Sequence, residues 1–291
     1  LTAALVNPVA VNSLNARLPD GSFAIPSGSG ALAGATPLVQ SGVSRFRENQ
    51  VNLNGDYNFS NDHSLSAKFF VADNPTTQAN YNFAGLGNGS NQLIGFGGDL
   101  TIKQKLYSIT DTYIISPNIV NQAKFGFNRL RVTSVPDEPF TSAELGITNP
   151  LASLYPGAPT LSFAGSDSVF VFGSSDQSSR INGYSFGNTL TWTRGNHRLK
   201  MGGEYRYSQV KFYFNAFSRG QIIYSDTFNS SGVRTATSFQ NFLMGIGTSL
   251  MGSGVFDRYY KVTDMNGFIQ DDWKVTNRLT GNLGLRYDLY G

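Results

Sequence analysis

The chain has 291 residues and a formal net charge of +3, and only 14% of its residues are charged, so the totals indicate neither a nucleic-acid-binding patch nor an acidic tail. It contains no cysteine, which excludes a disulfide framework and zinc–thiolate sites. Apolar residues make up 40% of the chain, and no stretch approaches the roughly eighteen consecutive apolar residues of a membrane-spanning helix. Abundant Gly, Phe and Tyr favour strands.

Residues 1–43 show no strand-like alternation, and we expect a loop or extracellular segment that precedes the first strand. The opening stretch, LTAALVNPVA, has neither an initiator Met nor the pattern of a secretory signal. We therefore expect the chain to be a fragment or a processed product. The remaining part, 44–291, is predicted to be one partial β-barrel.

Four pairs of segments alternate apolar and polar side chains with a period of two, which predicts strands whose two faces meet different media. A short polar turn joins the members of each pair, as in a β-hairpin. In chain order the pairs are 51–60 with 65–73, 105–115 with 120–132, 181–193 with 197–210, and 264–273 with 281–290. The sequence thus predicts about eight strands, each near the nine to eleven residues that a tilted strand needs to cross a bilayer.

The connections between these strands differ sharply in length. Short turns are predicted at 60–63, 116–119, 194–196 and 274–277, whereas the hairpins are separated by the long segments 75–98, 134–180 and 215–258. Outer-membrane barrels have short periplasmic turns and long extracellular loops. The asymmetry therefore predicts an all-β fold: about eight antiparallel strands of a larger transmembrane β-barrel, with long extracellular loops.

The two predicted faces carry different side chains. One face holds bulky charged groups in mid-strand, which a water-filled or plugged lumen accepts. The candidate lumen-lining residues are Asp56, Lys68, Lys200, Glu204, Arg206, Arg286 and Asp288. Four aromatic residues fall just before the short turns, where an aromatic belt at one membrane interface is expected. These candidate belt residues are Phe59, Tyr113, Trp192 and Trp273.

The sequence contains no convincing catalytic, cofactor-binding or metal-binding set. Asp271 and Asp272 are neighbours on a predicted strand, so their side chains point to opposite faces and cannot converge on a metal or a shared proton. His63 and His197 each fall in a predicted turn, and we expect both to be solvated, because a metal site needs several converging ligands. We expect no enzyme activity and no cofactor.

The stretch GFIQDDWKVTNRLTGNLGLRYDLYG at 267–291 resembles the TonB-dependent outer-membrane receptors of the Oar-like, carboxypeptidase-regulatory-domain type. Three further stretches agree with this resemblance, at 7–27, 113–129 and 190–207. It implies a twenty-two-stranded barrel, a plug domain, an N-terminal β-sandwich extension and energy supplied from the inner membrane through a TonB box. The chain shows no recognisable plug, TonB box or extension, so we expect an internal piece of such a barrel.

The sequence therefore predicts a barrel segment in the bacterial outer membrane for energised ligand uptake. Its expected partners are outer-membrane lipid, the TonB complex through a missing N-terminal region, and an unknown small ligand, which could be a siderophore, saccharide, peptide or cobalamin; no nucleic acid is expected. Two alternatives stay open at this stage. One is a small closed eight-stranded outer-membrane barrel with a structural or adhesive role, and the other is a secreted carbohydrate-binding β-sandwich.

Overall fold

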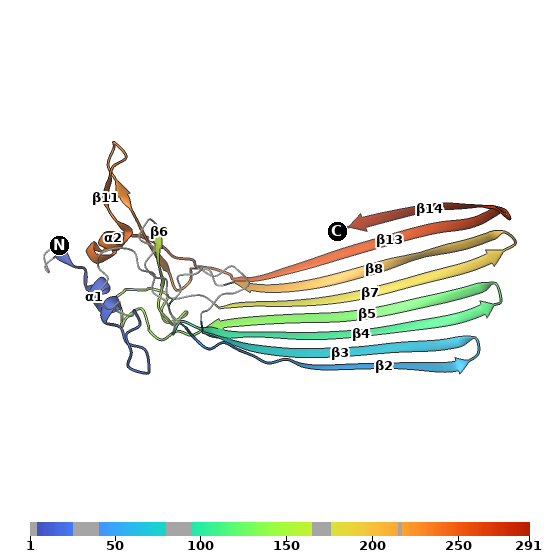
Figure 1. The fold of residues 1–291 in the computed structure, drawn as a ribbon, viewed down its shortest axis with the longest axis horizontal. Helices are drawn as coiled ribbons and strands as arrows, with labels where there is room; N and C mark the ends of the chain where they lie inside the picture. Colours follow the sequence, from blue (N-terminus) through green and yellow to red (C-terminus); the bar gives the residue numbers. More distant parts are fainter. Residues whose placement is uncertain (1–4, 26–40, 80–92, 94, 165–175, 215–216) are drawn as a thin grey trace.

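A computed structural model describes residues 5–25, 41–79, 93, 95–164, 176–214 and 217–291. Eight long strands form one antiparallel sheet, and shorter elements gather at one end of it (Figure 1). The long strands are β2 (Asn49–Ser60), β3 (His63–Gln78), β4 (Gly98–Ser116), β5 (Ile119–Pro136), β7 (Gln177–Arg194), β8 (His197–Phe214), β13 (Asp257–Thr276) and β14 (Leu279–Tyr290). This confirms the all-β prediction of about eight antiparallel strands.

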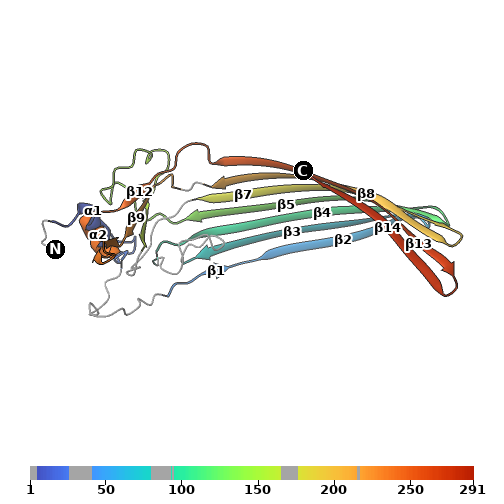
Figure 2. The same ribbon diagram turned by 90° about the horizontal axis from the view of Figure 1, so that it is seen from above.

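The strands pair in chain order, from β2 through β3, β4, β5, β7, β8 and β13 to β14. A two-residue strand, β1 (Arg45–Phe46), pairs with the end of β3 beside β2. Within the described residues the sheet is open, since β2 forms pairs with β3 alone and β14 with β13 alone. Figure 2 shows that the sheet is curved and twisted, as antiparallel sheets of this size are.

In each of the four hairpins a two-residue turn joins the two strands, and all four turns lie at the same end of the sheet (Figure 1). Three of them fall within the predicted turns. The predicted turn at 274–277 is wrong, because β13 continues to Thr276 and the chain reverses at 277–278. Val275 and Thr276 are β-branched and keep the backbone extended, and the register places Lys274 opposite Thr280.

Several strands extend beyond their predicted limits at the end away from the turns. β4 begins at Gly98 instead of residue 105, and β13 begins at Asp257 instead of residue 264. These extensions lack a clean apolar face, so the period-two pattern does not reveal them. Backbone hydrogen bonds continue the ladder there without help from apolar alternation.

The long connections contain folded structure that the sequence prediction missed. They and the N-terminal segment form a compact unit, here called the cap, at the end of the sheet opposite the turns (Figures 1 and 2). Its elements are α1 (Pro8–Asn15), β6 (Thr160–Ala164), β9 (Gln221–Ser225), β10 (Thr227–Phe228), β11 (Arg234–Ala236), α2 (Ser238–Met244) and β12 (Thr248–Leu250). Neither of these two helices has the length and apolar character needed to cross a membrane.

The buried apolar core lies in the cap. Its eleven members include Phe96, Leu161, Phe163, Tyr224 and Phe242, and no member of this described cluster belongs to the eight long strands. The apolar face of the sheet is exposed instead, with Leu283, Leu285 and Tyr287 of β14 at 64%, 72% and 70% exposure. Burial of this kind is the reverse of a β-sandwich, whose core lies between sheet faces.

Substitution of adjacent residues in β14 distinguishes the two faces. Leu285→Arg should destabilise the inserted full-length protein by about 2–4 kcal/mol, the cost of a cation on a lipid-facing strand near the bilayer midplane. Gly284→Arg should cost less, because Gly284 pairs with Gln270 on the polar face and its surroundings leave room for a Cβ. Reversible unfolding from liposomes measures both variants, and equal destabilisation would contradict this assignment of faces.

Candidate functional site

The register brings all seven predicted lumen-lining residues to one face of the sheet, here called the polar face. Directly paired residues of an antiparallel sheet share a face, and neighbours along a strand alternate. Glu204, Asn266 and Asp288 are aligned across β8, β13 and β14, one position away from the aligned apolar residues Tyr205, Met265 and Leu289. The same register puts these residues on the polar face: Asp56, Lys68, Lys200, Glu204, Arg206, Arg286 and Asp288.

Two arginine–carboxylate pairs dominate the polar face over β8 and β14. Arg206 donates two hydrogen bonds of 2.8 Å to the carboxylate of Glu204, and Arg286 binds the carboxylate of Asp288 in the same two-pronged way at 2.7–3.0 Å. Both arginine side chains are more than half exposed. Exposed pairs of this kind contribute about 1 kcal/mol or less to the free energy of unfolding. These charges therefore add little to stability, and they are available to interact with whatever lies against the polar face.

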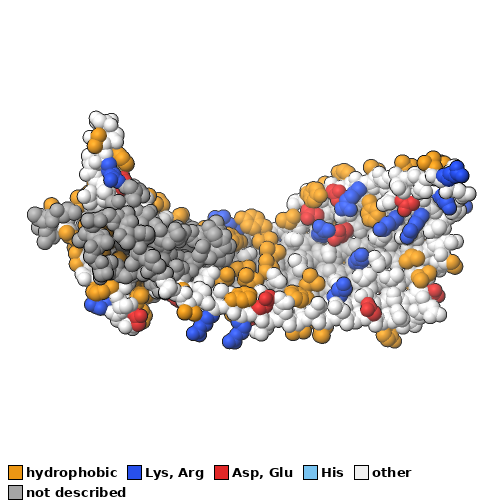
Figure 3. Space-filling view, viewed as in Figure 1, with side chains coloured by type: hydrophobic (Ala, Val, Ile, Leu, Met, Phe, Trp, Pro, Cys, Tyr) orange, Lys and Arg blue, Asp and Glu red, His pale blue; other side chains and the backbone are white. Residues whose placement is uncertain are grey.

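Figure 3 shows Lys, Arg, Asp and Glu side chains scattered over the face of the sheet seen in that view. A hollow of about 460 Å³ lies among residues of the polar face, lined by Ser108, Thr110, Lys124, Glu204 and Arg286, among others. The hollow exists because small residues line it. At Gly126, for example, an added Cβ would lie only 2.5 Å from the Ser185 hydroxyl oxygen. The hollow offers hydroxyl donors and acceptors beside both signs of charge, which suits a polar, water-soluble ligand.

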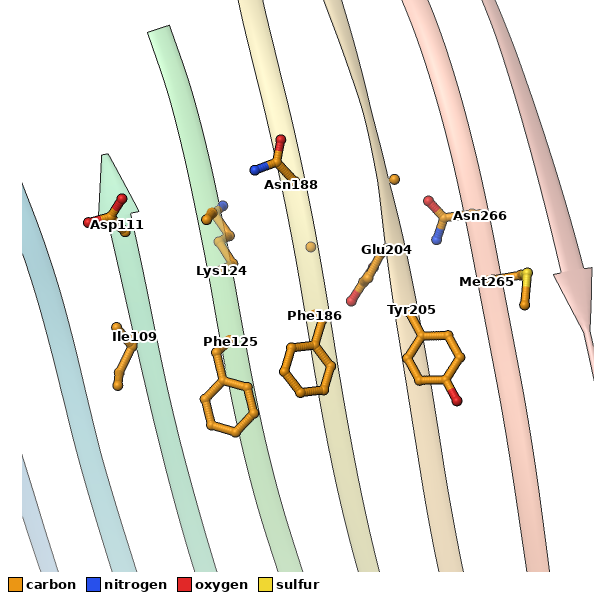
Figure 4. Close-up of a pocket in the computed structure, with 13 residues that line it drawn as sticks. Ile109, Asp111, Lys124, Phe125, Phe186, Asn188, Glu204, Tyr205, Met265 and Asn266 are labelled. Atoms are coloured by element: carbon orange, nitrogen blue, oxygen red, sulfur yellow. The ribbon is translucent and has the colours of Figure 1, made fainter. Parts of the chain in front are cut away.

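A larger hollow of about 640 Å³ lies on the apolar face (Figure 4). Ile109, Phe125, Phe186, Tyr205 and Met265 form a row across five neighbouring strands along one side of it. The Phe125 and Phe186 rings lie 5.0 Å apart. Its exposed surface is mostly apolar and open to the surroundings, so this hollow suits hydrocarbon better than a polar ligand. The other residues along its wall include Asp111, Lys124, Asn188, Glu204 and Asn266 (Figure 4).

The four candidate belt residues lie near the turns and on the apolar face. Tyr113 is opposite His63 in the register, and Trp192 is opposite Leu199. The Trp273 ring stacks on the His197 ring with centroids 5.4 Å apart, and the Phe59 ring lies 4.7 Å from the His63 ring. The geometry thus gathers the aromatic residues into two groups, each built around a histidine.

The prediction that both histidines are solvated turn residues is wrong. His63 and His197 are the first residues of β3 and β8, and each ring nitrogen lies 2.7 Å from a carboxylate, that of Asp111 or Asp271. Sequence reading missed these pairs because each joins two hairpins, across 48 and 74 residues. Asp271 and Asp272 do lie on successive positions of β13 and so face opposite sides. Among the described residues no three His, Asp or Glu side chains are grouped to hold a metal ion.

The cap is stabilised by a cluster of aromatic rings and by capping interactions at both ends of α2. The rings of Phe163, Tyr224 and Phe242 lie 5.2–5.5 Å from one another. Thr237 and Gln240 form a reciprocal capping box at the start of α2, and Gly245 ends it in the left-handed conformation. The Thr-x-x-Gln pattern was the available signal for this helix in the sequence.

A buried arginine joins two long connections of the cap. The Arg219 side chain is only 9% exposed, and it donates hydrogen bonds to Glu138 at 2.7 Å, to Asp176 at 3.0 Å and to the Pro156 carbonyl oxygen at 2.7 Å. Gly157 has a φ of +120°, and a Cβ there would meet the Arg219 side chain at 3.0 Å. The guanidinium group therefore holds residues 138–157 against the segment that leads into β9.

Burial also changes two titratable groups of the cap and its base. It raises the pKa of the Tyr224 hydroxyl above its ordinary value. Burial, followed by the neighbouring negative charge of Asp99, raises the pKa of the Asp137 carboxyl group at the end of β5. The Tyr224 shift reflects the burial of this side chain in the aromatic core of the cap.

The fold and the two faces define a class: an antiparallel sheet that forms part of a membrane β-barrel wall. Residues 1–291 match the family model described as an outer membrane beta barrel domain, so the chain belongs to that family and resides in the outer membrane. A comparison with curated proteins found no match.

Two solved structures match most of this chain at low sequence identity. The outer membrane transporter YddB from Escherichia coli is 14% identical with a TM-score of 0.37, over 84% of this chain and 34% of that chain. The siderophore receptor PirA from Acinetobacter baumannii is 12% identical with a TM-score of 0.46, over 86% of this chain and 30% of that chain. The chain thus spans about a third of the length of either protein.

Removal of the buried guanidinium should open the cap locally. Arg219→Gln leaves Glu138 without its main cation, and loss of one partner from a buried pair costs about 3–5 kcal/mol. Hydrogen exchange of residues 138–164 in the full-length protein should speed up accordingly. Arg17→Gln is the matched control, because Arg17 is exposed and its guanidinium group donates a hydrogen bond to the Gly21 carbonyl oxygen at 2.8 Å; it should cost about 1 kcal/mol or less. Equal effects would refute the role of Arg219.

Proposed function

We propose that the chain forms a wall segment and outer cap of a TonB-dependent receptor that takes up a small ligand across the outer membrane with energy from the inner membrane. The observation that carries the proposal is the division of the sheet into a charged face and an exposed apolar face, with a folded cap at one end only. A barrel wall needs lipid on one side and water or a plug on the other.

The polar face would line the lumen. Its seven charged residues and the hollow beside Lys124 and Glu204 present both signs of charge and several hydroxyl groups to whatever passes. A wide barrel with such a lining accepts a polar ligand. We propose that the ligand passes through without being chemically changed. The ligand class stays open among siderophore, saccharide, peptide and cobalamin.

The cap would be the capture surface outside the cell, and the segment 1–43 would belong to it. Short turns on the periplasmic side and long connections outside are the usual arrangement in outer-membrane barrels. The aromatic residues near the turns would then mark the periplasmic interface, where amphipathic rings are enriched. The sequence motif at 267–291 supports the TonB-dependent class, and the TonB complex would be reached through a region N-terminal to this chain.

The exposed apolar face of the sheet argues against the secreted β-sandwich, which would bury that face in a core. The open edges at β2 and β14, within the described residues, likewise give no support to a closed eight-stranded barrel. Hydrocarbon does not tolerate unpaired strand edges, so further strands are expected to complete the wall.

Cysteine labelling in intact cells tests the orientation. Ser230→Cys, in an exposed part of the cap, should react with a membrane-impermeant maleimide on cells that express the full-length protein. Asn196→Cys, in the turn between β7 and β8, should react only after the outer membrane is permeabilised. Equal reaction of the two variants in intact cells would contradict the orientation.

Ligand uptake with and without TonB tests the function. Candidate ligands of the four classes are supplied as radiolabelled compounds to wild-type cells, to cells lacking the gene and to cells lacking TonB. One ligand should accumulate in wild-type cells and fall to background in both mutants. Double replacement Glu204→Gln with Arg206→Gln should alter uptake of that ligand, whereas Arg278→Gln, in a turn, should not. Uptake independent of TonB would overturn the proposal.

A further inference from the structure

A groove of about 630 Å³ opens on the apolar face beside the turn that joins β7 and β8. Trp192, Leu199 and Trp273 provide its apolar wall, and Arg194 and His197 provide its polar end. These five side chains come from three neighbouring strands, β7, β8 and β13. Both tryptophans of the chain line this one groove.

The polar end of the groove is positively charged and ordered. The His197 Nδ1 donates to the Asp271 Oδ2 at 2.7 Å and the ring stacks on Trp273, so the imidazole is fixed with Nε2 as its second polar atom. Arg194 lies with its guanidinium carbon 5.6 Å from the centre of the Trp192 ring. Among the described residues no carboxylate lies within ion-pair distance of Arg194, and its side chain is exposed.

We propose that this groove is a binding site for one glycerophospholipid of the periplasmic leaflet, with its phosphate beside Arg194 and His197. An exposed cation next to two interfacial tryptophans has the chemistry that a lipid phosphate needs, because guanidinium groups bind phosphate oxygens through paired N–H donors. The assignment to the periplasmic leaflet rests on the orientation given under the proposed function.

The apolar face also offers a track for an acyl chain. From the groove the track crosses Leu199 and then Met201 and Ile269, which are paired in the register. Next comes the Gly203–Gly267 pair, whose lack of side chains lowers the surface, and the track ends at the larger apolar hollow with Phe186 and Tyr205. Trp192 and Phe186 are six positions apart on β7, about 20 Å along a strand, which is a length suited to a long acyl chain.

The chain contains a matched site that lacks the cation. His63 lies 2.7 Å from Asp111 and contacts the Phe59 and Tyr113 rings, so its histidine, carboxylate and aromatic residues repeat those around His197. Ser60 lies opposite His63 in the register, at the place that Arg194 takes opposite His197, so the matched site has a hydroxyl group where the other has a guanidinium group. Asp62, in the adjoining turn, repels a phosphate. Aromatic belt character is therefore common to both sites, and phosphate binding is expected only at Arg194.

Photo-crosslinking of lipid to the full-length protein tests the proposal. The protein is reconstituted in vesicles of phosphatidylethanolamine and phosphatidylglycerol that contain a phosphatidylethanolamine with a photoreactive headgroup, and labelled peptides are identified by mass spectrometry. The peptide around 192–199 should be labelled more heavily than the peptide around 57–65. Arg194→Gln should reduce labelling at 192–199 about fivefold, the factor that corresponds to about 1 kcal/mol for one basic side chain at an anionic surface.

Two further variants make the result specific. Arg194→Lys should retain most of the labelling, and Ser60→Arg should raise labelling at 57–65, because it supplies the missing cation at the place opposite His63. Heat-modifiable migration on gels confirms that each variant is folded. Equal labelling of the two peptides in the wild-type protein, or no change in Arg194→Gln, would overturn the site. The labelling experiment requires no ligand uptake, so failure of the transport proposal alone would leave this labelling pattern intact.

Discussion

An apolar sheet face with no protein against it is the constraint on which the rest of this structure depends. Soluble monomers rarely expose contiguous apolar patches larger than a few hundred Å², yet β14 alone leaves Leu283, Leu285, Tyr287 and Leu289 between 47% and 72% exposed. Lipid is the medium that removes this cost. Once lipid covers one face, backbone groups must pair along the whole ladder. The seven predicted lumen-lining residues lie on the other face, and the charged residues Arg194 and Asp271 of the apolar face lie near the turns.

The energy of folding is consequently divided between two regions. The wall obtains its order from long hydrogen-bonded hairpins and from the surrounding membrane, and its side chains need no tight mutual packing. The cap lies beyond the ladder and must fold as a water-soluble unit, so it contains the buried aromatic cluster of Phe163, Tyr224 and Phe242 and the buried Arg219. A barrel wall built in this way carries a structured, water-soluble cap at one end of a lipid-dependent sheet.

The sequence predicted the features that repeat along a strand and missed those that depend on contacts between distant segments. Alternation around residues 281–290 identified both the strand and its two faces, because each side chain reports the medium that it meets. The His197–Asp271 pair and the cap core were missed, since partners 74 residues apart leave no periodic trace. The sequence prediction placed the last turn too early, at 274–277, because it took the polar residue Lys274 as the start of the turn. Lys274 instead pairs with Thr280 in the strand ladder, and the chain reverses at 277–278.

Site-directed spin labelling along β14 tests the central claim most directly. Single nitroxide labels at positions 282–289 of the full-length protein in liposomes are compared for collisions with oxygen, which concentrates in lipid, and with a water-soluble nickel complex. The structure predicts a period of two, with positions 283, 285, 287 and 289 accessible to oxygen and the alternate positions accessible to nickel, since successive residues face opposite sides. Nickel access at all eight positions, or an absence of alternation, would contradict a lipid-facing wall.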